Sequence, residues 1–596
     1  MTVPPIEPVP APHNQGQAPG DALDFSWAPA LVEHAITVGR HIRVVCIGAG
    51  FSGVNLAIHL REKCRDYEFV AYEMAKDVGG VWHHNRYMGA ACDLPAHTYQ
   101  YSFAENTQWS RFYAPQPEIC QYISDVVDKY KIRDEIKLEH QVIGAEWDDD
   151  EGKWHVKAKN LKTEEEFEDV ADFVCYATGR EKFKGIIHHS SGWDYRKEED
   201  DNLGVSPYKG KRVGVIGTGS SAIQIVPIMR EKVGAEGVVF NFGRTKTWLT
   251  GTFASGILEQ LVKTKEGELN RPFPEVSWPN EKLTRVADTF SDETKKKLRD
   301  DRAYYRDFRG LIEADLSSVH AITRTGAPIQ EEYREAVRKA MLELLSSKPE
   351  IAEALVPDFP LACYLESLVL DNCHLVTDAI ESFTEKGLKL KSGEEIELDA
   401  IICATGFNTT SVPAFPIYGK NGVNLQDLWK DEARTYLGLL VPEMPNFFSV
   451  LGAQTVVGTG SLLSMMEQAV AYVAKTVNKC QREGYKSWTI KDSVVDDFLK
   501  YTDNYFPRTV YSANCRSWYK NGNYGGKIRT VWPGASSHCF IALRDPRWED
   551  FEWVRHDKTY PHSMSWLRNG NVPDHLPLNF FTDELRAQYK ETTFIA

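Results

Sequence analysis

The chain has 596 residues and a mass of 67.6 kDa, with 42% hydrophobic residues, 26% charged residues and a formal net charge of -15. This length exceeds what one hydrophobic core supports, so we expect two or three packed domains. Nucleic acid and anionic membrane surfaces would both repel so acidic a chain, and neither is expected as a main partner.

The first 40 residues are rich in proline and polar side chains, and we predict a flexible leader there. They lack the basic flank and apolar run of a secretory signal. No run of about eighteen apolar residues occurs, so no membrane-spanning helix is expected. The 11 cysteines form no Cys-x-x-Cys pair, which disfavours a zinc site or a redox-active disulfide. Cysteines in apolar runs, such as Cys46, Cys175 and Cys403, suit a reduced, cytoplasmic protein.

The first predicted element is a buried parallel strand, Ile42–Ile47, followed by a G-x-G-x-x-G loop and a helix. In such a loop the first glycine permits a tight turn, the second admits a pyrophosphate, and the third lets the helix pack on the strand. A second strand ends at Glu73, whose carboxylate can accept a hydrogen bond from a ribose hydroxyl. The pattern predicts a dinucleotide site with contacts from Gly48, Gly50, Gly53 and Glu73.

The arrangement recurs at the strand Arg212–Ile216 and the G-x-G-x-x-A loop after it. Here cations stand where the first site has its acid, and a carboxylate would repel a 2'-phosphate that arginine can bind. The first site therefore favours FAD and the second NADPH. The predicted NADPH contacts are Gly217, Thr218, Gly219, Ser220, Ser221, Ala222, Ile223, Arg244, Thr245 and Lys246. The alternative is that Arg244 is only a solvated surface charge.

Later segments complete the predicted architecture. Residues 171–179 and 398–407 are buried-strand patterns that end on Ala-Thr-Gly and indicate chain crossings between the nucleotide domains. We predict an α/β fold with two Rossmann-like dinucleotide-binding domains, for FAD and NADPH, and a charged helical insertion. The expected limits are a leader at 1–40, the FAD domain at 41–182, the NADPH domain at 183–390 with the insertion at about 250–350, and a second part of the FAD domain with the C-terminal region at 391–596.

Flavin disulfide reductases also contain two dinucleotide folds, but they need a cysteine pair beside the flavin. This chain has no such pair, so electrons from NADPH would pass through the flavin to another acceptor, and O2 is the obvious candidate. A motif between the two glycine loops supports this choice. It reads F-x-G-x-x-x-H-x-x-x-W-D at Phe183, Gly185, His189, Trp193 and Asp194.

By this motif the chain resembles the type I Baeyer-Villiger monooxygenases, within the flavin-containing monooxygenases. The likeness covers nearly all of the chain after the leader. Relatives that oxidise heteroatoms usually end the motif on Tyr or Phe instead of Trp-Asp. The resemblance implies catalytic roles for Asp93 and His189, no metal, an NADP contact at Trp518, nicotinamide contacts at Ala91, Cys92 and Asp93, and FAD contacts at Val81, Trp82, His83, His84, Asp93, Leu94 and Tyr99.

The resemblance also implies a reaction. NADPH reduces FAD, O2 is activated there, and one oxygen atom is inserted next to the carbonyl of a small ketone, giving an ester or lactone. A developing peroxide anion needs a positive group beside it and a site that keeps water out. In relatives an arginine supplies this charge, held by the aspartate that matches Asp93. The expected substrate is a polyketide, terpenoid or steroid-like ketone of secondary metabolism.

The chain departs from the family at this arginine. The segment PDFPLACYLESL passes directly from Cys363 to Tyr364, where relatives carry two basic residues and a Pro-Gly-rich turn. Loss of one preorganised donor to such an anion costs about 10²–10³ in rate. Three explanations stay open: a coding segment missing from the sequence, a replacement cation such as Arg309 or Arg324, or loss of oxygenation. The alternative functions are therefore N- or S-oxygenation and a catalytically impaired nucleotide-binding protein.

Overall fold

The structure of this chain is a computed structural model that divides into two compact units. The larger unit holds residues 40–481 and 485–554, and the smaller unit holds the remaining residues. None of the described helices combines the length and the apolar character needed to cross a bilayer. The predicted leader lies almost wholly outside the residues that the structure describes, which are 39–178, 188–190, 193–194, 206–243, 290, 292–356, 372–405, 411–456, 458–513, 517–520, 525–556 and 563–570.

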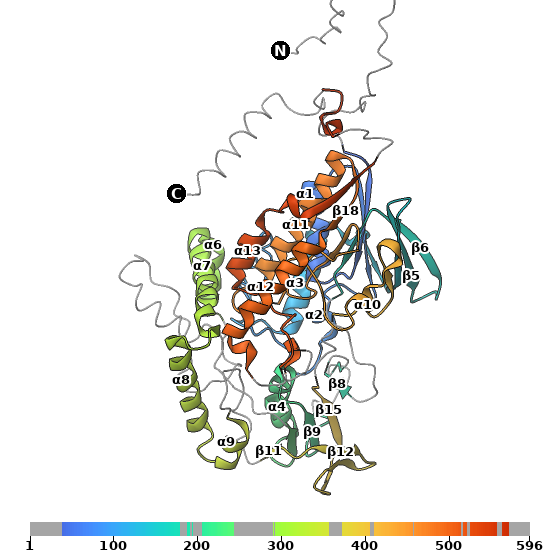
Figure 1. Ribbon diagram of the computed structural model, residues 1–596. Helices are drawn as coiled ribbons and strands as arrows, with labels where there is room; N and C mark the ends of the chain where they lie inside the picture. The colour runs from blue at the N-terminus through green and yellow to red at the C-terminus, as the bar shows by residue number, and fades with distance from the viewer. Residues whose placement is uncertain are drawn as a thin grey trace, which may run out of the picture. The chain divides into compact units, whose positions relative to one another are not determined.

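The first sheet of the larger unit has five parallel strands in the order β17-β7-β1-β2-β3. Its N-terminal strands, blue in Figure 1, lie beside helices α1 and α11. Side chains alternate across β1, so that Val44 and Cys46 face a core with helices α1, α3 and α11, whereas Val45 and Ile47 face a second core. The elements are β1 (Ile42–Ile47), β2 (Tyr67–Glu73), β3 (Ile136–Leu138), β7 (Phe173–Tyr176), β17 (Phe447–Ser449), α1 (Phe51–Lys63), α3 (Gln116–Lys129) and α11 (Leu462–Glu483).

The second core lies between the first sheet and a four-stranded sheet in the order β16-β4-β5-β6. Its largest side chains are those of Trp147 on β4, Trp154 on β5 and Trp429. The strands are β4 (His140–Asp148), β5 (Lys153–Asn160), β6 (Glu166–Ala171) and β16 (Ile417–Tyr418). Further elements are α10 (Leu425–Leu428), β18 (Tyr485–Ile490), α12 (Asp492–Tyr505), α13 (Ser536–Arg544) and β19 (Phe551–Arg555).

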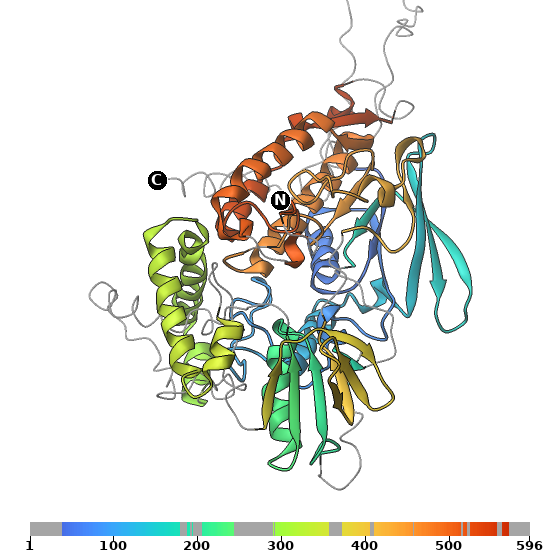
Figure 2. The same ribbon diagram turned by 60° about the horizontal axis from the view of Figure 1, so that its bottom comes forward.

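A second parallel sheet has the order β11-β10-β9-β15-β8, and helix α4 packs on it (Figure 2). Its strands are β8 (His188–His189), β9 (Arg212–Ile216), β10 (Val238–Phe242), β11 (Cys373–Val376) and β15 (Ala400–Cys403), and α4 spans Ser220–Val233. The small antiparallel sheet beside it holds β12 (Ile380–Phe383), β13 (Gly387–Leu390) and β14 (Glu395–Glu397).

The two parallel sheets confirm the predicted α/β fold with two Rossmann-like halves. One boundary needs correction. Strand β15 pairs with β9 along Ala400–Cys403, so the second sheet continues past the limit at residue 390. An apolar run indicates that a strand is buried, but it does not show which strand it pairs with. Here β15 pairs with β9 and therefore belongs to the second sheet.

The described part of the charged insertion, residues 292–356, is helical, as its periodicity predicts. Tyr305, Phe308 and Ile312 recur at helical spacing on α7 and join the core of the first sheet. Met341 and Leu345 instead join the core of the second sheet. The insertion therefore contacts both halves through α6 (Asp292–Asp300), α7 (Arg302–Ser318), η3 (Val319–Thr323), α8 (Pro328–Leu344) and α9 (Pro349–Leu355).

A buried carboxylate connects strand ends of the first sheet and of the four-stranded sheet. Asp172, between β6 and β7, accepts a hydrogen bond from the backbone N–H of Arg43 at 2.8 Å. It also forms ion pairs with Arg40 at 2.5 Å and Lys153 at 2.7 Å. Burial alone would raise the pKa of this carboxyl, but the two cations hold the pKa below its usual value.

Replacement of Asp172 by asparagine should lower the free energy of unfolding by about 3 kcal/mol at pH 7, because two cations lose a buried partner. The folded-state pKa lies below the unfolded value of about 3.9. The loss of unfolding free energy in the variant should be complete above that value and shrink as pH falls through the folded-state pKa. Urea unfolding of both proteins at pH 7 and pH 3 measures this loss. Asp545→Asn, at an exposed ion pair, is the control, and equal stabilities at pH 7 would contradict the prediction.

Candidate cofactor and active site

The first glycine loop has the geometry of a phosphate-binding turn. Gly48 has a φ of 106°, and a Cβ there would lie 2.7 Å from the carbonyl oxygen of Ala177. A Cβ at Gly53 would collide with the carbonyl oxygen of Gly48. Gly50 is the N-cap of α1 and makes no side-chain capping bond, which leaves N–H groups of the first turn for a ligand. The loop thus admits only glycine at two positions and presents a helix N-terminus.

Glu73 lies at the end of β2 next to this loop and is buried. Its Oε2 accepts a hydrogen bond from the N–H of Ala49 at 2.9 Å, and its Oε1 accepts one from Ala75 at 2.8 Å. Burial raises the pKa of the carboxyl, and the backbone donors partly offset that effect. The two carboxylate oxygens offer more acceptor sites than these backbone donors fill, which suits a ribose hydroxyl. The loop, the helix N-terminus and the acid together fit the adenosine and pyrophosphate parts of FAD.

The segment from residue 77 to residue 103, here called the flavin segment, follows β2 and begins with the short helix α2 (Val81–His84). Buried Trp82 donates a hydrogen bond from its Nε1 to the hydroxyl of buried Tyr99 at 3.0 Å. Burial raises the pKa of this phenol. Cys92 is also buried, Leu94 is partly buried, and Val81 and Asp93 are exposed. Two of the predicted FAD contacts, Trp82 and Tyr99, thus form one buried aromatic pair.

The second glycine loop repeats the geometry of the first at β9 and α4. Gly217 has a φ of 121°, and a Cβ there would collide with the carbonyl oxygen of Ala404. Gly219 is the N-cap of α4, and no atom lies within 4 Å of a Cβ built on it. That open space at a helix N-terminus fits the pyrophosphate of a second dinucleotide. Ser220 is exposed, and Ala222 is buried. Partly buried side chains belong to Thr218, Ser221 and Ile223.

The residues predicted to select NADPH lie outside the described residues. They are Arg244, Thr245 and Lys246, which follow β10 directly. The side chain of Trp518 is also outside, although its backbone begins the short helix η8 (Trp518–Lys520). Contacts of these four side chains with NADPH stay a prediction.

Two polar side chains that we did not single out connect the flavin segment with the second sheet. Tyr87 donates a hydrogen bond from its hydroxyl to Gln224 Oε1 at 2.7 Å. Gln224, on α4, donates from Nε2 to the carbonyl oxygen of Ala91 at 3.0 Å. Gln224 therefore holds Ala91, a predicted nicotinamide contact, next to the second glycine loop. A polar residue within the apolar run Ala222–Met229 of α4 was the only sequence signal for it.

The described part of the fingerprint motif packs at the edge of the second sheet. His189, on β8, is buried, and β8 pairs with β15. The backbone N–H of Trp193 donates to the carbonyl oxygen of His189 at 3.1 Å. Asp194 forms an ion pair with Arg86 of the flavin segment at 3.3 Å. The motif therefore links the two halves, while Phe183 and Gly185 lie outside the described residues.

The structure separates the two arginines that the sequence offers as replacement cations. Arg309 forms an ion pair with Glu105 at 3.3 Å, and its side chain is only 13% exposed. Arg324 lies over the ring of Tyr505, 4.7 Å from the ring centroid. Within the described ranges, neither arginine forms an ion pair with Asp93. Residues 357–371, which include the junction of Cys363 and Tyr364, lie outside these ranges.

Comparison with known proteins identifies relatives over most of the chain. A family model described as a NAD(P)-binding Rossmann-like domain matches residues 46–115. The FAD-binding monooxygenase moxY of Dothistroma septosporum is 32% identical over 555 residues, which cover 88% of this chain and 82% of that protein. A Baeyer-Villiger monooxygenase of Pseudomonas aeruginosa is 30% identical over 512 residues, covering 83% of this chain and 88% of that protein.

Solved structures with the same fold include monooxygenases with bound cofactors. An oxidised steroid monooxygenase bound to NADP is 26% identical, with a TM-score of 0.64 over 87% of this chain and 100% of that chain. The OTEMO complex with FAD and NADP has a TM-score of 0.67 at 22% identity and covers 86% of this chain and 99% of that chain. The likeness at 22% identity shows the common fold.

Proposed function

Because this chain belongs to the family of FAD-binding monooxygenases that includes Baeyer-Villiger monooxygenases, we propose that it inserts one oxygen atom of O2 next to the carbonyl of a small ketone. It is an FAD-dependent NADPH monooxygenase, and the proposed product is an ester or lactone. The observation that carries the ketone assignment is the fingerprint ending on Trp193 and Asp194. The ion pair of Asp194 with Arg86, in the flavin segment, supports a role for that ending at the site. We propose a cyclic ketone of secondary metabolism as the substrate.

In the proposed site, the residues of the first glycine loop would hold FAD. The first-turn N–H groups of α1 would donate to its pyrophosphate, and Glu73 would accept from its ribose. Trp82 and Tyr99 exclude water on the side of the flavin segment. When bound, FAD supplies the centre that takes electrons from NADPH and passes them to O2. This chain's own contribution is to bind, orient and shield that centre.

NADPH is proposed to lie across the second glycine loop. The N-terminus of α4 binds its pyrophosphate at the open space beside Gly219, and Arg244 and Lys246 bind its 2'-phosphate. Gln224 holds Ala91 by a hydrogen bond and would thereby orient this nicotinamide contact. We propose that Asp93, exposed next to Cys92, orients the cation that the reaction needs, and that His189 supports this site from β8.

One observation favours a second candidate function. The sequence passes directly from Cys363 to Tyr364, where relatives carry the arginine that stabilises the developing anion. Without a cation there, the chain would bind both cofactors and consume NADPH without transferring oxygen to a ketone. That behaviour would define a catalytically impaired nucleotide-binding protein, and its product would be hydrogen peroxide.

Incubation of the FAD-loaded protein with NADPH, labelled O2 and a panel of cyclic ketones should yield products heavier by one labelled oxygen atom, detected by mass spectrometry. The label should appear in the ester or lactone, because one atom of O2 is inserted and the other leaves as water. Amines and sulfides in parallel reactions test N- and S-oxygenation. NADPH consumption that forms only hydrogen peroxide with every ketone would reject the proposed function and favour the impaired protein.

A further inference from the structure

A loop at the end of the flavin segment, residues 97–106, is held from two sides and is called the docking loop below. On one side, Tyr99 accepts a hydrogen bond from Trp82, and Tyr101 donates from its hydroxyl to the carbonyl oxygen of Phe51 at 2.6 Å. Phe51 is the first residue of α1, directly after Gly50. This side of the docking loop therefore contacts α1 and α2, where FAD is proposed to bind.

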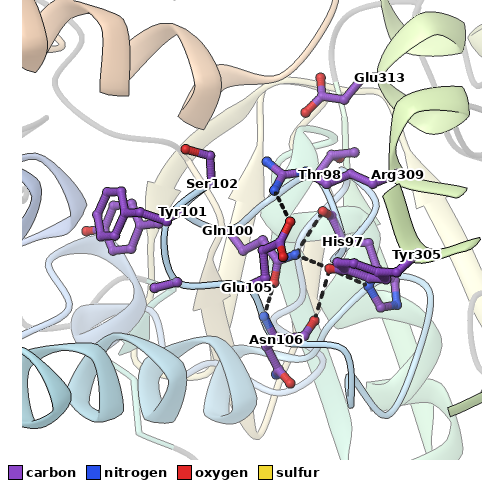
Figure 3. A network of polar contacts seen from close by, with 12 residues as sticks. His97, Thr98, Gln100, Tyr101, Ser102, Glu105, Asn106, Tyr305, Arg309 and Glu313 are labelled. Atoms are coloured by element: carbon purple, nitrogen blue, oxygen red, sulfur yellow. Dashed lines mark hydrogen bonds and ion pairs between the residues drawn. The ribbon is translucent and has the colours of Figure 1, made fainter. Parts of the chain in front are cut away.

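The other side of the docking loop contacts helix α7 of the insertion (Figure 3). Tyr305 accepts a hydrogen bond on its hydroxyl from Gln100 Nε2 at 2.5 Å, and this hydroxyl also lies 3.4 Å from His97 Nδ1. Gln100 Oε1 accepts from the N–H of Asn106 at 2.8 Å, which closes the docking loop on itself. The ring of Phe308 packs edge-on against His97, with the ring centroids 5.3 Å apart. One turn of α7 thus contacts the docking loop through both polar and aromatic side chains.

Charge strengthens the same contact. Arg309 of α7 forms its ion pair with Glu105 of the docking loop, and both side chains are mostly buried. Two more carboxylates face the same arginine. Burial raises the pKa of Glu313 and Glu467, and Arg309 partly offsets the shift in both groups. Without Arg309, these three carboxylates would share one buried region with no buried cation among them. The resulting repulsion and desolvation would destabilise the docked conformation of the docking loop.

The third carboxylate ties the docking loop to a further element. Glu467, on α11, accepts hydrogen bonds from the N–H and the hydroxyl of Ser102, both at 2.6 Å. His97 is fully buried, and burial lowers its pKa to about 3, so it adds no positive charge at neutral pH. Arg302, which also pairs with Glu105 at 2.7 Å, is 59% exposed and therefore screened by solvent. Arg309 is left as the principal buried cation of the described contact.

We propose that Arg309 and Tyr305 of helix α7 are positioning residues of the FAD site, which hold the docking loop in the conformation that places Tyr99 and Tyr101 against α1 and α2. FAD binds the molecules in which the docking loop is docked. The apparent FAD affinity is therefore proportional to the fraction of molecules that remain docked. This role excludes Arg309 as the missing reaction cation, because its guanidinium is committed to Glu105. The inference rests on the proposed FAD site and not on the ketone assignment.

The test compares the FAD dissociation constants of full-length variants, measured by titrating apoprotein with FAD and following flavin fluorescence. Arg309→Met should bind FAD about tenfold more weakly, the effect of one charged hydrogen bond. Arg309→Lys keeps the charge and should recover most of that loss. Tyr305→Phe, which keeps the ring, should show a smaller loss. Arg306→Met is the matched control, since Arg306 is exposed on the same helix and should bind FAD like the wild type.

A double-mutant cycle separates positioning from general destabilisation. Glu105→Gln combined with Arg309→Met should bind FAD no more weakly than Arg309→Met alone, because the two residues act through one ion pair. If Arg309→Met and Tyr305→Phe lower the melting temperature but bind FAD like the wild type, the inference is overturned. Should Arg309→Met fail to fold, Tyr305→Phe and Arg309→Lys decide the matter. Wild-type protein that takes up no FAD would instead overturn the proposed FAD site itself.

Discussion

Replacement of Gly53 by alanine should yield a protein that does not retain FAD through purification. The added methyl group would collide with the carbonyl oxygen of Gly48, and it would lie 3.4 Å from the Sγ of Cys46. A collision with backbone cannot be relieved by a rotamer change, so α1 must move away from β1 and the phosphate-binding turn must open. Overpacking of this kind costs about 3 kcal/mol, which is about a hundredfold in affinity. The flavin absorbance per protein and the FAD dissociation constant measure the effect.

The matched control for this variant is Gly310→Ala. Gly310 lies within α7, and no atom comes within 4 Å of a Cβ built on it. Alanine is also a better helix former than glycine by about 1 kcal/mol, so the control should be at least as stable as the wild type. A Gly53→Ala protein that is yellow, with the wild-type dissociation constant, would contradict the assignment of FAD to the first glycine loop.

Replacement of Gly217 by alanine should leave the protein yellow but strongly weaken its reduction by NADPH. The residue combines a φ of 121° with an approach to the carbonyl oxygen of Ala404 that leaves no room for a methyl group. Backbone strain and steric overlap together cost about 3 kcal/mol, or about a hundredfold in the NADPH concentration needed for half-maximal reduction. Anaerobic mixing with NADPH, followed by flavin absorbance, measures this step without any oxygen chemistry.

Two controls make this second result specific. Dithionite should reduce the flavin of Gly217→Ala as completely as that of the wild type, because it needs no dinucleotide site. Gly219→Ala should fold with unchanged stability, since a methyl group there meets no protein atom, and any loss of NADPH affinity then reports how close the cofactor comes. Normal reduction of Gly217→Ala at low NADPH concentration would place the nicotinamide cofactor elsewhere.

The two glycine loops were predictable because each is a contiguous strand, turn and helix. The positive φ of Gly48 and of Gly217, and the acid at the end of β2, depend on neighbours within one β-α-β unit. Local backbone geometry therefore carries the signal, and the sequence alone predicted both glycine loops and the alternation of elements around them. The family resemblance then indicated a flavin monooxygenase with a fingerprint motif at Trp193 and Asp194, and the relatives confirm that family.

Contacts between segments far apart in the chain were not predictable. Gln224 forms hydrogen bonds with Tyr87 and Ala91, and Arg309 forms an ion pair with Glu105. These partners are so far apart in the chain that no sequence periodicity indicates that they meet. Arg309 was therefore a candidate reaction cation by charge alone, and only its buried partner showed its commitment to the docking loop.

The sequence by itself determined the local parts: the strand, turn and helix of each nucleotide site, the acid of the first site, and the helical character of the insertion. Only the tertiary structure decided which sheet β15 joins and that the insertion packs on both cores. The physical reason is that hydrogen bonds within a turn or helix depend on adjacent residues, whereas strand neighbours and ion-pair partners depend on which packing buries the most apolar surface with its charges paired.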